Sequence, residues 1–451
     1  MAKHERKTYL VTSAQKGGLP NREVLGCFQQ YCRVNNAELI IREMSGKIRN
    51  SEEEIHPDLE QYVSRSKDQK LNEKIRMKEW QILPQQIIPT TGLARFTATD
   101  VSTIFSNPKQ FIRVVANSNN TLPKVLMTTG AITHPNYVLS HRVGQIALAD
   151  HVYGAMVVEI EGDNEYHFRP VTALKNGQFV DLGLKYNDKK DPEDCSLEAM
   201  VLGDWHCGDT NDQVRDATFR MITKYNPKLI VLHDFWNGHS VNHHEKDKKN
   251  TQVRNYERGR LSLPEEFKLA AKELQALAEV APNSEIYIVA CNHHDFLNRY
   301  IESGSYVNDE QNYRVAHQIA LAMLDGKNPI GYGLEISGGV PEKVKFLERD
   351  QDLKVRGWQL GAHGDQGPNG AKNMSLRALE DSYGKSITGH KHTPAMYRNT
   401  IVVGTSSNLR LDYNEGPSGW MNSHALLWGI TPSIGTAQLI NIVNGDWEKK
   451  E

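Results

Sequence analysis

Five short blocks in the C-terminal half of the chain are rich in residues that bind divalent metal ions. They lie at 203–206, 233–234, 292–293, 363–365 and 389–392. Their Asp, Asn and His side chains offer oxygen and imidazole ligands that suit manganese, iron, zinc and, in part, magnesium. A single block carries little weight, since an isolated histidine is usually structural or solvated. The ordered series predicts a site for two neighbouring divalent metals, with one histidine to spare for proton transfer.

Two metals held in this way are suited to the hydrolysis of phosphate esters. A phosphodiester resists attack by water because its oxygens already carry negative charge. Two cations about 3.5–4 Å apart neutralise those oxygens, lower the pKa of a water and align the attacking and leaving groups. Thiolates are not required, and the cysteines form no CxxC pair. We expect Cys27, Cys32, Cys195, Cys207 and Cys291 to be free thiols in a reducing compartment.

The residues before each block are those that should position it. The apolar runs 197–202, 228–232, 285–290 and 357–360 each end shortly before a block, and each resembles a buried strand bounded by polar residues. Active sites of open α/β sheets lie at the carboxyl ends of the strands. The spacing therefore predicts that the blocks meet at one edge of such a sheet.

The order of these blocks resembles that of the calcineurin-like metallophosphoesterases, over roughly residues 197–445. The resemblance implies that seven residues bind the metals and one transfers a proton. It assigns Asp204, His206 and His392 to the first metal, Asn292, His363 and His390 to the second, and Asp234 to a bridging position. It assigns His293 the role of general acid, or of stabilising the charge on the phosphate.

The sequence departs from the family pattern at two places. His233 stands where the family usually has glycine, and the third block continues as His293-His294-Asp295, so that His294 separates the catalytic histidine from its usual acidic neighbour. His294 could therefore share or replace the role of His293.

A cluster of basic residues follows the bridging aspartate and bears on the substrate. Between residues 246 and 260 there are six basic and two acidic residues. Lys and Arg contacts to phosphates supply most non-specific affinity for nucleic acids, and the aromatic rings of Trp236 and Tyr256 could stack on bases. The residues predicted to bind substrate are His239, His243, His244, Lys248, Lys249 and Arg254. A solvated charged loop is the alternative.

A DNA nuclease is the first functional hypothesis. The resemblance extends to nucleases like the catalytic subunits of double-strand-break repair complexes and to phage-encoded members that degrade DNA. It implies two manganese ions, although iron, zinc or magnesium would also fit the ligands. A phosphatase or nucleotide phosphodiesterase with a small substrate is the second hypothesis. A non-catalytic metal-binding assembly protein is the third.

Length and composition predict two domains in a protein of 451 residues. The net charge of −2 provides no overall attraction to nucleic acid, so DNA binding requires a local patch. No apolar run is long enough to cross a membrane, and the N-terminus is polar, which favours a cytoplasmic protein (in the host cytoplasm if it is phage-encoded).

The polar run 186–194, which contains Pro192, is the expected domain boundary. Residues 1–190 would form an α/β domain that begins with a strand at 8–12, a helix at 21–31 and a strand at 37–41. Two roles stay open for this domain, substrate positioning and self-association as a homo-oligomer.

Residues 197–451 would form the α/β metallophosphoesterase domain, a two-sheet sandwich flanked by helices. We expect its helices at 264–281, 308–324 and 374–383. The strands at 400–404, 425–428 and 437–442 would close the second sheet.

Overall fold

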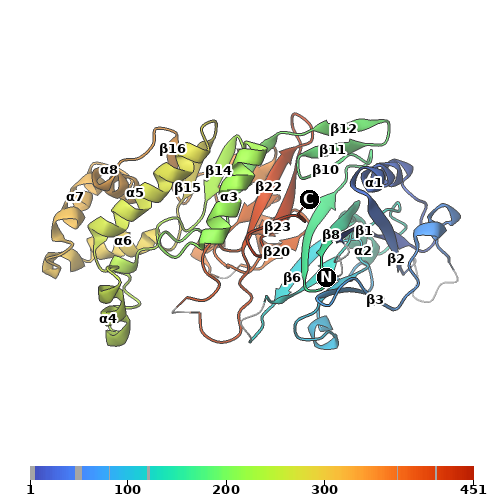
Figure 1. Cartoon of the computed structure of the whole chain (residues 1–451), viewed down its shortest axis with the longest axis horizontal. Coiled ribbons are helices and arrows are strands. Elements are labelled where there is room, and N and C mark those ends of the chain that lie inside the picture. The colour runs from blue at the N-terminus through green and yellow to red at the C-terminus, as the bar shows by residue number, and fades with distance from the viewer. Residues whose placement is uncertain are drawn as a thin grey trace.

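The computed structural model describes residues 6–45, 53–80, 82–118, 122–372, 374–411 and 414–450. Within these ranges the chain has a mixed α/β structure, as predicted, with its strands in four sheets (Figure 1). The helices are α1 (Arg22–Asn35), α2 (Arg142–Ala149), α3 (Asp212–Tyr225), α4 (Lys249–Glu257), α5 (Leu263–Val280), α6 (His294–Glu302), α7 (Tyr313–Leu324), α8 (Pro329–Ser337) and α9 (Leu376–Tyr383). None of the described helices is long and apolar enough to cross a membrane.

A six-stranded sheet is formed by the strands that precede the first three ligand blocks. Its spatial order is β16 (Val344–Leu347), β15 (Glu285–Val289), β14 (Leu229–Leu232), β13 (Leu197–Val201), β22 (Ser423–Gly429) and β23 (Gly435–Asn441). The strands β13 to β16 are parallel, and β22 and β23 add to the sheet in antiparallel pairings. The strands predicted at 197–202, 228–232 and 285–290 are confirmed.

A ten-stranded sheet combines segments from both halves of the chain. Its order is β17 (Lys354–Val355), β18 (Trp358–Gln359), β19 (Ser386–Thr388), β21 (Thr400–Val402), β20 (Ala395–Tyr397), β6 (Phe111–Val115), β7 (Lys124–Thr128), β5 (Ser102–Phe105), β4 (Ile75–Lys78) and β3 (Asp68–Lys70). The halves meet where β6 pairs with β20, with Ile112 opposite Met396. The division into 1–190 and 197–451 stays a prediction, and the two stretches are joined through this sheet.

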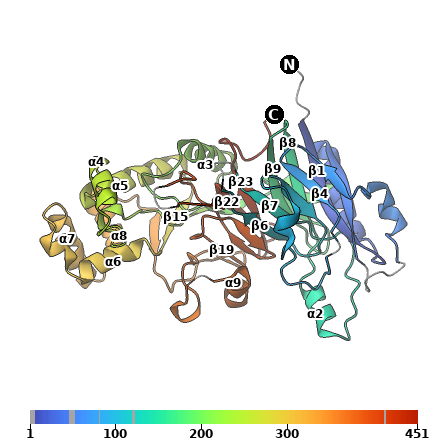
Figure 2. The same cartoon turned by 90° about the horizontal axis from the view of Figure 1, so that it is seen from below.

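The two large sheets pack face to face. Successive side chains of β13 point to opposite faces of its sheet, so one set contacts the ten-stranded sheet and the other contacts helices. Ala199 and Val201 belong to a buried cluster with Ile401 of the ten-stranded sheet. Met200 belongs to a cluster with residues of α3 and α5. Leu379 of α9 packs on the ten-stranded sheet. Figure 2 shows α3 and α5 on one side of the sheets and α9 on the other.

The prediction for the three tail strands is wrong in part. The strand expected at 400–404 is β21 of the ten-stranded sheet, but those expected at 425–428 and 437–442 are β22 and β23 of the six-stranded sheet. The strand β22 is buried over nearly its whole length and pairs with β13, with Ala425 opposite Val201. A strand that is buried on both faces can belong to either sheet, so the apolar pattern alone does not predict which sheet contains β22.

The N-terminal part contributes two smaller sheets. One has the order β2 (Ala37–Met44), β1 (Arg6–Gln15), β8 (Gly154–Glu161) and β9 (Glu165–Thr172) and packs with α1, as the predicted strand-helix-strand opening requires. The other contains β10 (Phe179–Asp181), β11 (Leu184–Asn187) and β12 (Lys190–Asp194). The polar run 186–194, the expected domain boundary, contains the hairpin of β11 and β12. Pro192 is tolerated because β12 lies at a sheet edge.

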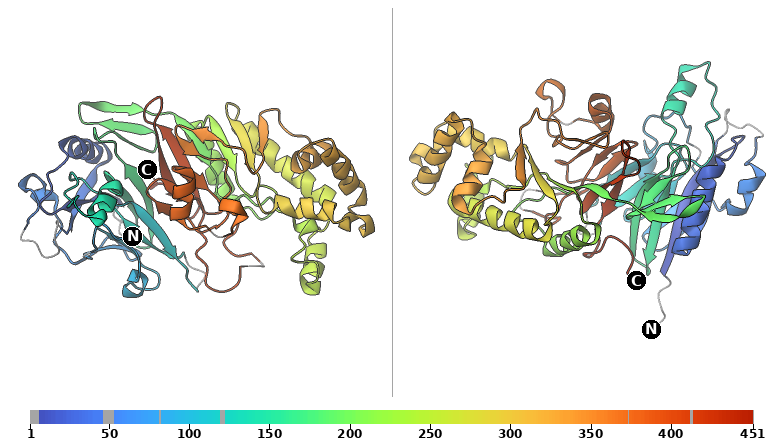
Figure 3. Two further views of the ribbon diagram at one scale, coloured as in Figure 1. Left: turned by 180° about the vertical axis from the view of Figure 1, so that it is seen from behind. Right: turned by 90° about the horizontal axis from the view of Figure 1, so that it is seen from above.

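The helices confirm two of the three predictions closely and correct the third. The predicted helices 264–281 and 374–383 correspond to α5 and α9, but the helix expected from residue 308 begins at Tyr313, after a short 3-10 turn at Ser305–Asn308. The charged run after residue 246, for which a loop was the alternative, contains the helix α4. In both views of Figure 3 the yellow and orange helices lie at the opposite end of the molecule from the blue N-terminal sheet.

Candidate metal centre

The parallel strands bring the predicted ligands to one edge of the six-stranded sheet. Asp204 follows β13, Asp234 follows β14 and Asn292 follows β15. Hydrogen bonds between the connecting segments hold these turns together, because the backbone N–H of His206 donates to the carbonyl of Asp234 at 2.8 Å. The turns that carry His390 and His392 enter from the ten-stranded sheet after β19.

One group of possible metal ligands is fully buried. The ligand atoms of Asp204, His206, Asp234 and His392 all lie within 4.8 Å of one another. The two Nε2 atoms of His206 and His392 are 2.9 Å apart, and that of His392 is 3.0 Å from Oδ2 of Asp204. Such convergence of lone pairs is typical of ligands around a cation.

A second group shares Asp234 with the first. The ligand atoms of Asp234, His363 and His390 lie within the same 4.8 Å limit. Nε2 of His363 is 3.3 Å from Oδ2 of Asp234 and 3.2 Å from Oδ1 of Asn292, which also lies 3.1 Å from Nδ1 of His390. His390 is only partly buried, so this group lies nearer to solvent than the first.

The hydrogen bonding of the buried atoms fits the presence of a cation. Both carboxylate oxygens of Asp204, Oδ1 of Asp234 and Nδ1 of His206 are buried and accept or donate no hydrogen bond within the described structure. The contact between His392 and Asp204 is close in distance but lacks hydrogen-bond geometry. Buried polar atoms without partners are costly, and coordination of a cation would satisfy those oxygens. These groups could therefore hold a metal ion.

The protonation of the ligands is set by burial and by their neighbours. Burial opposes the ionisation of Asp234, but His363 and His293 hold its pKa well below the usual range. Burial and the neighbouring His392 lower the pKa of His206 to about 3, so its imidazole is neutral at pH 7. Burial disfavours the charged form of His363, yet Asp234 raises its pKa to about 9. A bound cation would replace that proton.

The backbone is strained at several ligands. His206, Asp234, His390 and His392 have φ values of 52°, 42°, 75° and 53°. Non-glycine residues rarely adopt this left-handed conformation, which costs on the order of 1–3 kcal/mol each and persists only where the surrounding structure imposes it. The strain is concentrated in the turns that direct imidazole and carboxylate groups to one point.

Gly389 allows two of these turns to approach closely, a role that the sequence did not reveal. A Cβ atom at this position would lie 2.2 Å from Oδ1 of Asp204 and 2.8 Å from Cβ of His233. Any side chain would therefore displace the Asp204 carboxylate. The requirement arises from contacts between residues nearly two hundred positions apart in sequence, which no local motif records.

His293 lies beside the ligand groups without belonging to either. Its ring centroid is 4.9 Å from that of His206, and its Nδ1 is 2.6 Å from the carbonyl oxygen of Asn237. His293 is partly buried, whereas His294 is buried as the first residue of α6. Burial lowers the pKa of His294 to about 3, and its Nε2 has no hydrogen-bond partner among the described residues.

Arg349 connects the acidic residue that His294 displaces to the His363 block. Arg349 contacts Oδ2 of Asp295 at 2.7 Å and Oδ1 of Asp365 at 2.9 Å. Asp295 follows His294, and Asp365 belongs to the His363 block. His233, the other departure from the family pattern, places its Nδ1 3.4 Å from Nδ1 of His363.

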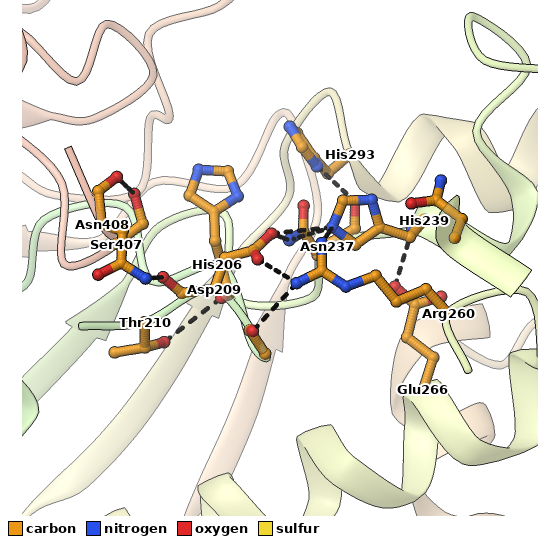
Figure 4. A network of polar contacts seen from close by, with 12 residues as sticks. His206, Asp209, Thr210, Asn237, His239, Arg260, Glu266, His293, Ser407 and Asn408 are labelled. Carbon is orange, nitrogen blue, oxygen red and sulfur yellow. Dashed lines mark hydrogen bonds and ion pairs between the residues drawn. The ribbon is translucent and has the colours of Figure 1, made fainter. Parts of the chain in front are cut away.

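A polar network that the sequence did not reveal contacts His293 through the carbonyl oxygen of Asn237 (Figure 4). Asn237 donates from Nδ2 to Oδ2 of Asp209 at 2.8 Å, and the same oxygen is 2.9 Å from Nε2 of His239. Arg260 pairs with the other carboxylate oxygen at 2.5 Å. Burial opposes ionisation of Asp209, but His239 and Arg260 lower its pKa to about 2. The carboxylate is thus charged and connected through Asn237 to His293.

The residues predicted to bind substrate are divided by the structure. His239 lies in the network beside His293, whereas His243 and His244 pack against Phe296 of α6. Lys248, Lys249 and Arg254 are exposed at and near α4.

Trp236 and Tyr256, the two predicted stacking residues, differ completely in exposure. Tyr256 is 72% exposed, but Trp236 is fully buried and stacks on Phe267 with ring centroids 5.2 Å apart. The prediction that Trp236 stacks on bases is therefore wrong, since its ring belongs to the core below the helices.

The chain is similar to a phage protein over nearly its whole length. "Protein A1" of Escherichia phage T5 is 26% identical to this chain over an alignment that covers 97% of this chain and 82% of that protein. No family model matches the chain. One solved crystal structure is 12% identical and covers 53% of this chain and 97% of that one, but its TM-score of 0.27 supports no conclusion about a shared fold.

Proposed function

We propose that this protein is a two-metal phosphodiester hydrolase of the calcineurin-like metallophosphoesterase type and that its substrate is DNA. The observation that carries the proposal is the position of Asp234. Its carboxylate belongs to both groups of possible ligands, with His206 and His392 in one and His363 and His390 in the other. A carboxylate common to two adjacent ligand sets is what a two-metal phosphoesterase requires.

The fold supports this assignment. Two sheets pack against each other with helices on the outer faces, and the ligands lie beyond the carboxyl ends of parallel strands. This arrangement agrees with the sandwich that the sequence resemblance implies. Similarity to a phage T5 protein supports a role in the phage-infected cell, within the host cytoplasm.

Two manganese ions, the expected cofactors, would neutralise the phosphate and activate a water. Asp204, His206 and His392 would hold one ion, and Asn292, His363 and His390 the other, with Asp234 available to both groups. The substrate would approach from the partly buried side, where Asn292, His293 and His390 lie.

His293 would protonate the leaving oxygen. A carbonyl oxygen only accepts hydrogen bonds, so Nδ1 of His293 carries a hydrogen that it donates to Asn237, and Nε2 is left to exchange a proton with the substrate. His294 is less suited to this role because it is buried and its lowered pKa keeps it neutral at pH 7.

Hydrolysis of bis-p-nitrophenyl phosphate with manganese tests whether the protein is a hydrolase at all. We expect the wild-type protein to release p-nitrophenol and the Asp234→Asn variant to release none above background. A wild-type protein that binds manganese without turnover would instead favour a metal-binding assembly protein. Turnover of this compound without cleavage of DNA would favour the small-substrate phosphodiesterase.

A further inference from the structure

A pocket of about 260 Å³ lies beside the candidate metal centre, and nothing in the proposed two-metal chemistry uses it. Its walls come from α4, the segments on either side of this helix, and Arg410 and Leu411. Asp209 and His239, whose side chains are largely buried, also line it, and these residues belong to the network that reaches His293. The pocket is thus separated from the proposed proton donor by a single residue, Asn237.

The walls of the pocket carry more positive than negative charge. Arg258, Arg260 and Arg410 line it, together with Asp209 and Glu245. Both carboxylates already have partners within the protein. Asp209 is paired with Arg260 and His239, and Oε2 of Glu245 accepts a hydrogen bond from Asn255 at 2.9 Å.

The arginines are suited to binding an anion in the pocket. Arg410 donates from Nη1 to the carbonyl oxygens of Asn414 and Gly416, at 3.1 and 2.7 Å, so its guanidinium is oriented by groups that carry no full charge. Arg260 is held in place by Asp209, and its side chain remains 26% exposed. An oriented guanidinium offers a planar fork of N–H donors, which matches the oxygens of a phosphate.

We propose that this pocket binds a phosphodiester group of the substrate strand adjacent to the one that is cleaved. The inference rests on the proposed function, because it assumes that the cleaved phosphate lies beside His293. It adds that the enzyme selects a polymer over a simple diester, since only a substrate with a second phosphate can occupy both places. Asp209 and His239 would act as positioning residues that orient Arg260.

Binding of a fluorescent single-stranded oligonucleotide to the metal-free protein tests the pocket independently of turnover. We expect Arg410→Gln and Arg258→Gln each to raise the Kd about tenfold, as the loss of one charge-assisted contact implies. The slope of log K against log salt should fall by about one. Arg33→Gln is the matched control, because it removes one exposed charge from α1, at the opposite end of the molecule from α4 (Figure 1), and should leave the Kd unchanged.

A second measurement uses the manganese-loaded protein. The ratio of kcat/KM for the oligonucleotide to that for bis-p-nitrophenyl phosphate should fall about tenfold in both pocket variants. Two variants are used so that the result does not depend on one arginine, because Arg410 also donates to the carbonyl oxygens of Asn414 and Gly416. An equal rise in Kd in Arg33→Gln, or an unchanged Kd in both pocket variants, would overturn the assignment. If the pocket variants bind the oligonucleotide more weakly than the wild-type protein but no DNA is cleaved, the nuclease proposal is rejected. The assignment of the pocket as a phosphate-binding site is then retained.

Discussion

Nδ1 of His293 lies 2.6 Å from the carbonyl oxygen of Asn237, and this contact determines which ring nitrogen of His293 can exchange a proton. Asn237 is itself held by Asp209, which lies between His239 and Arg260. The orientation of the proposed acid therefore depends on residues that belong to neither group of possible metal ligands.

Replacement of His293 by Ala should reduce kcat by about 10²–10⁴, the usual contribution of general acid catalysis. The metal content should stay that of the wild-type protein, because His293 belongs to neither ligand group. Elemental analysis beside steady-state kinetics checks both expectations. His294→Ala serves as the comparison. If that variant loses turnover and His293→Ala keeps it, the roles of the two histidines must be exchanged.

Replacement of Asp234 by Asn should affect both metal positions, whereas Asn292→Ala should affect only one. Asp234 is common to both groups, but Oδ1 of Asn292 lies beside His363 and His390 of the second group. Since a ligand that binds only the folded state stabilises it by about 2.7 kcal/mol at 100 times its Kd, manganese should raise the Tm of the wild-type protein. The rise should be absent in Asp234→Asn and reduced in Asn292→Ala. An Asp234→Asn protein that retains the full rise would show that this carboxylate does not bind the metals.

Acid should weaken the network around Asp209 within a definite pH range. The pKa of this carboxyl is about 2 in the folded protein, against an ordinary value of 3.8, because His239 and Arg260 outweigh the opposing effect of burial. A lowered pKa contributes stability that is present above about pH 4 and is lost as the pH falls towards 2. The shift corresponds to roughly 2 kcal/mol.

Urea unfolding between pH 7 and pH 2.5 measures this contribution. The Asp209→Asn variant should be less stable than the wild-type protein at pH 7, and the difference should shrink as the pH falls below 4. A difference that stays constant over this range would mean that the charge of Asp209 does not stabilise the fold.

Neutralising the exposed cations near α4 should weaken DNA binding without affecting hydrolysis of a small diester. The triple change of Lys248, Lys249 and Arg254 to Gln removes three charges that the structure places at the surface. If each contacts a phosphate, the slope of log K against log salt should fall by roughly three. Unchanged cleavage of DNA in the triple variant would show that this part of the surface does not contact the substrate.

His363, His390 and His392 enter the site from the ten-stranded sheet. Asp204, Asp234 and Asn292 could be predicted from the sequence because each follows a short apolar strand, and parallel strands bring their carboxyl ends to one edge. Asp204 and Asp234 illustrate this directly. The network of Asp209, Asn237 and His239 could not be predicted in the same way, since its members stand at no characteristic spacing. Their proximity depends on how α5 and the segment after β14 pack, which local patterns do not encode.

The shared sheet was beyond sequence reasoning for a similar reason. The pairing of Ile112 with Met396 joins segments separated by more than half of the chain. The apolar pattern of a strand does not specify which other strand it pairs with. The prediction that Trp236 stacks on bases was wrong because a tryptophan beside a basic run can equally pack in the hydrophobic core. Its stacking on Phe267 of α5 shows that it does.

Manganese-dependent cleavage of linear and circular double-stranded DNA, with the Asp204→Ala protein as control, tests the central claim most directly. Asp204 lies in the fully buried ligand group, so its loss should disable the metal centre. We expect the wild-type protein to cut DNA and the control to leave it intact, with the circular substrate separating endonuclease from exonuclease action. Intact DNA with the manganese-loaded wild-type protein, or equal cutting by the control, would contradict the assignment of this site as a nuclease centre.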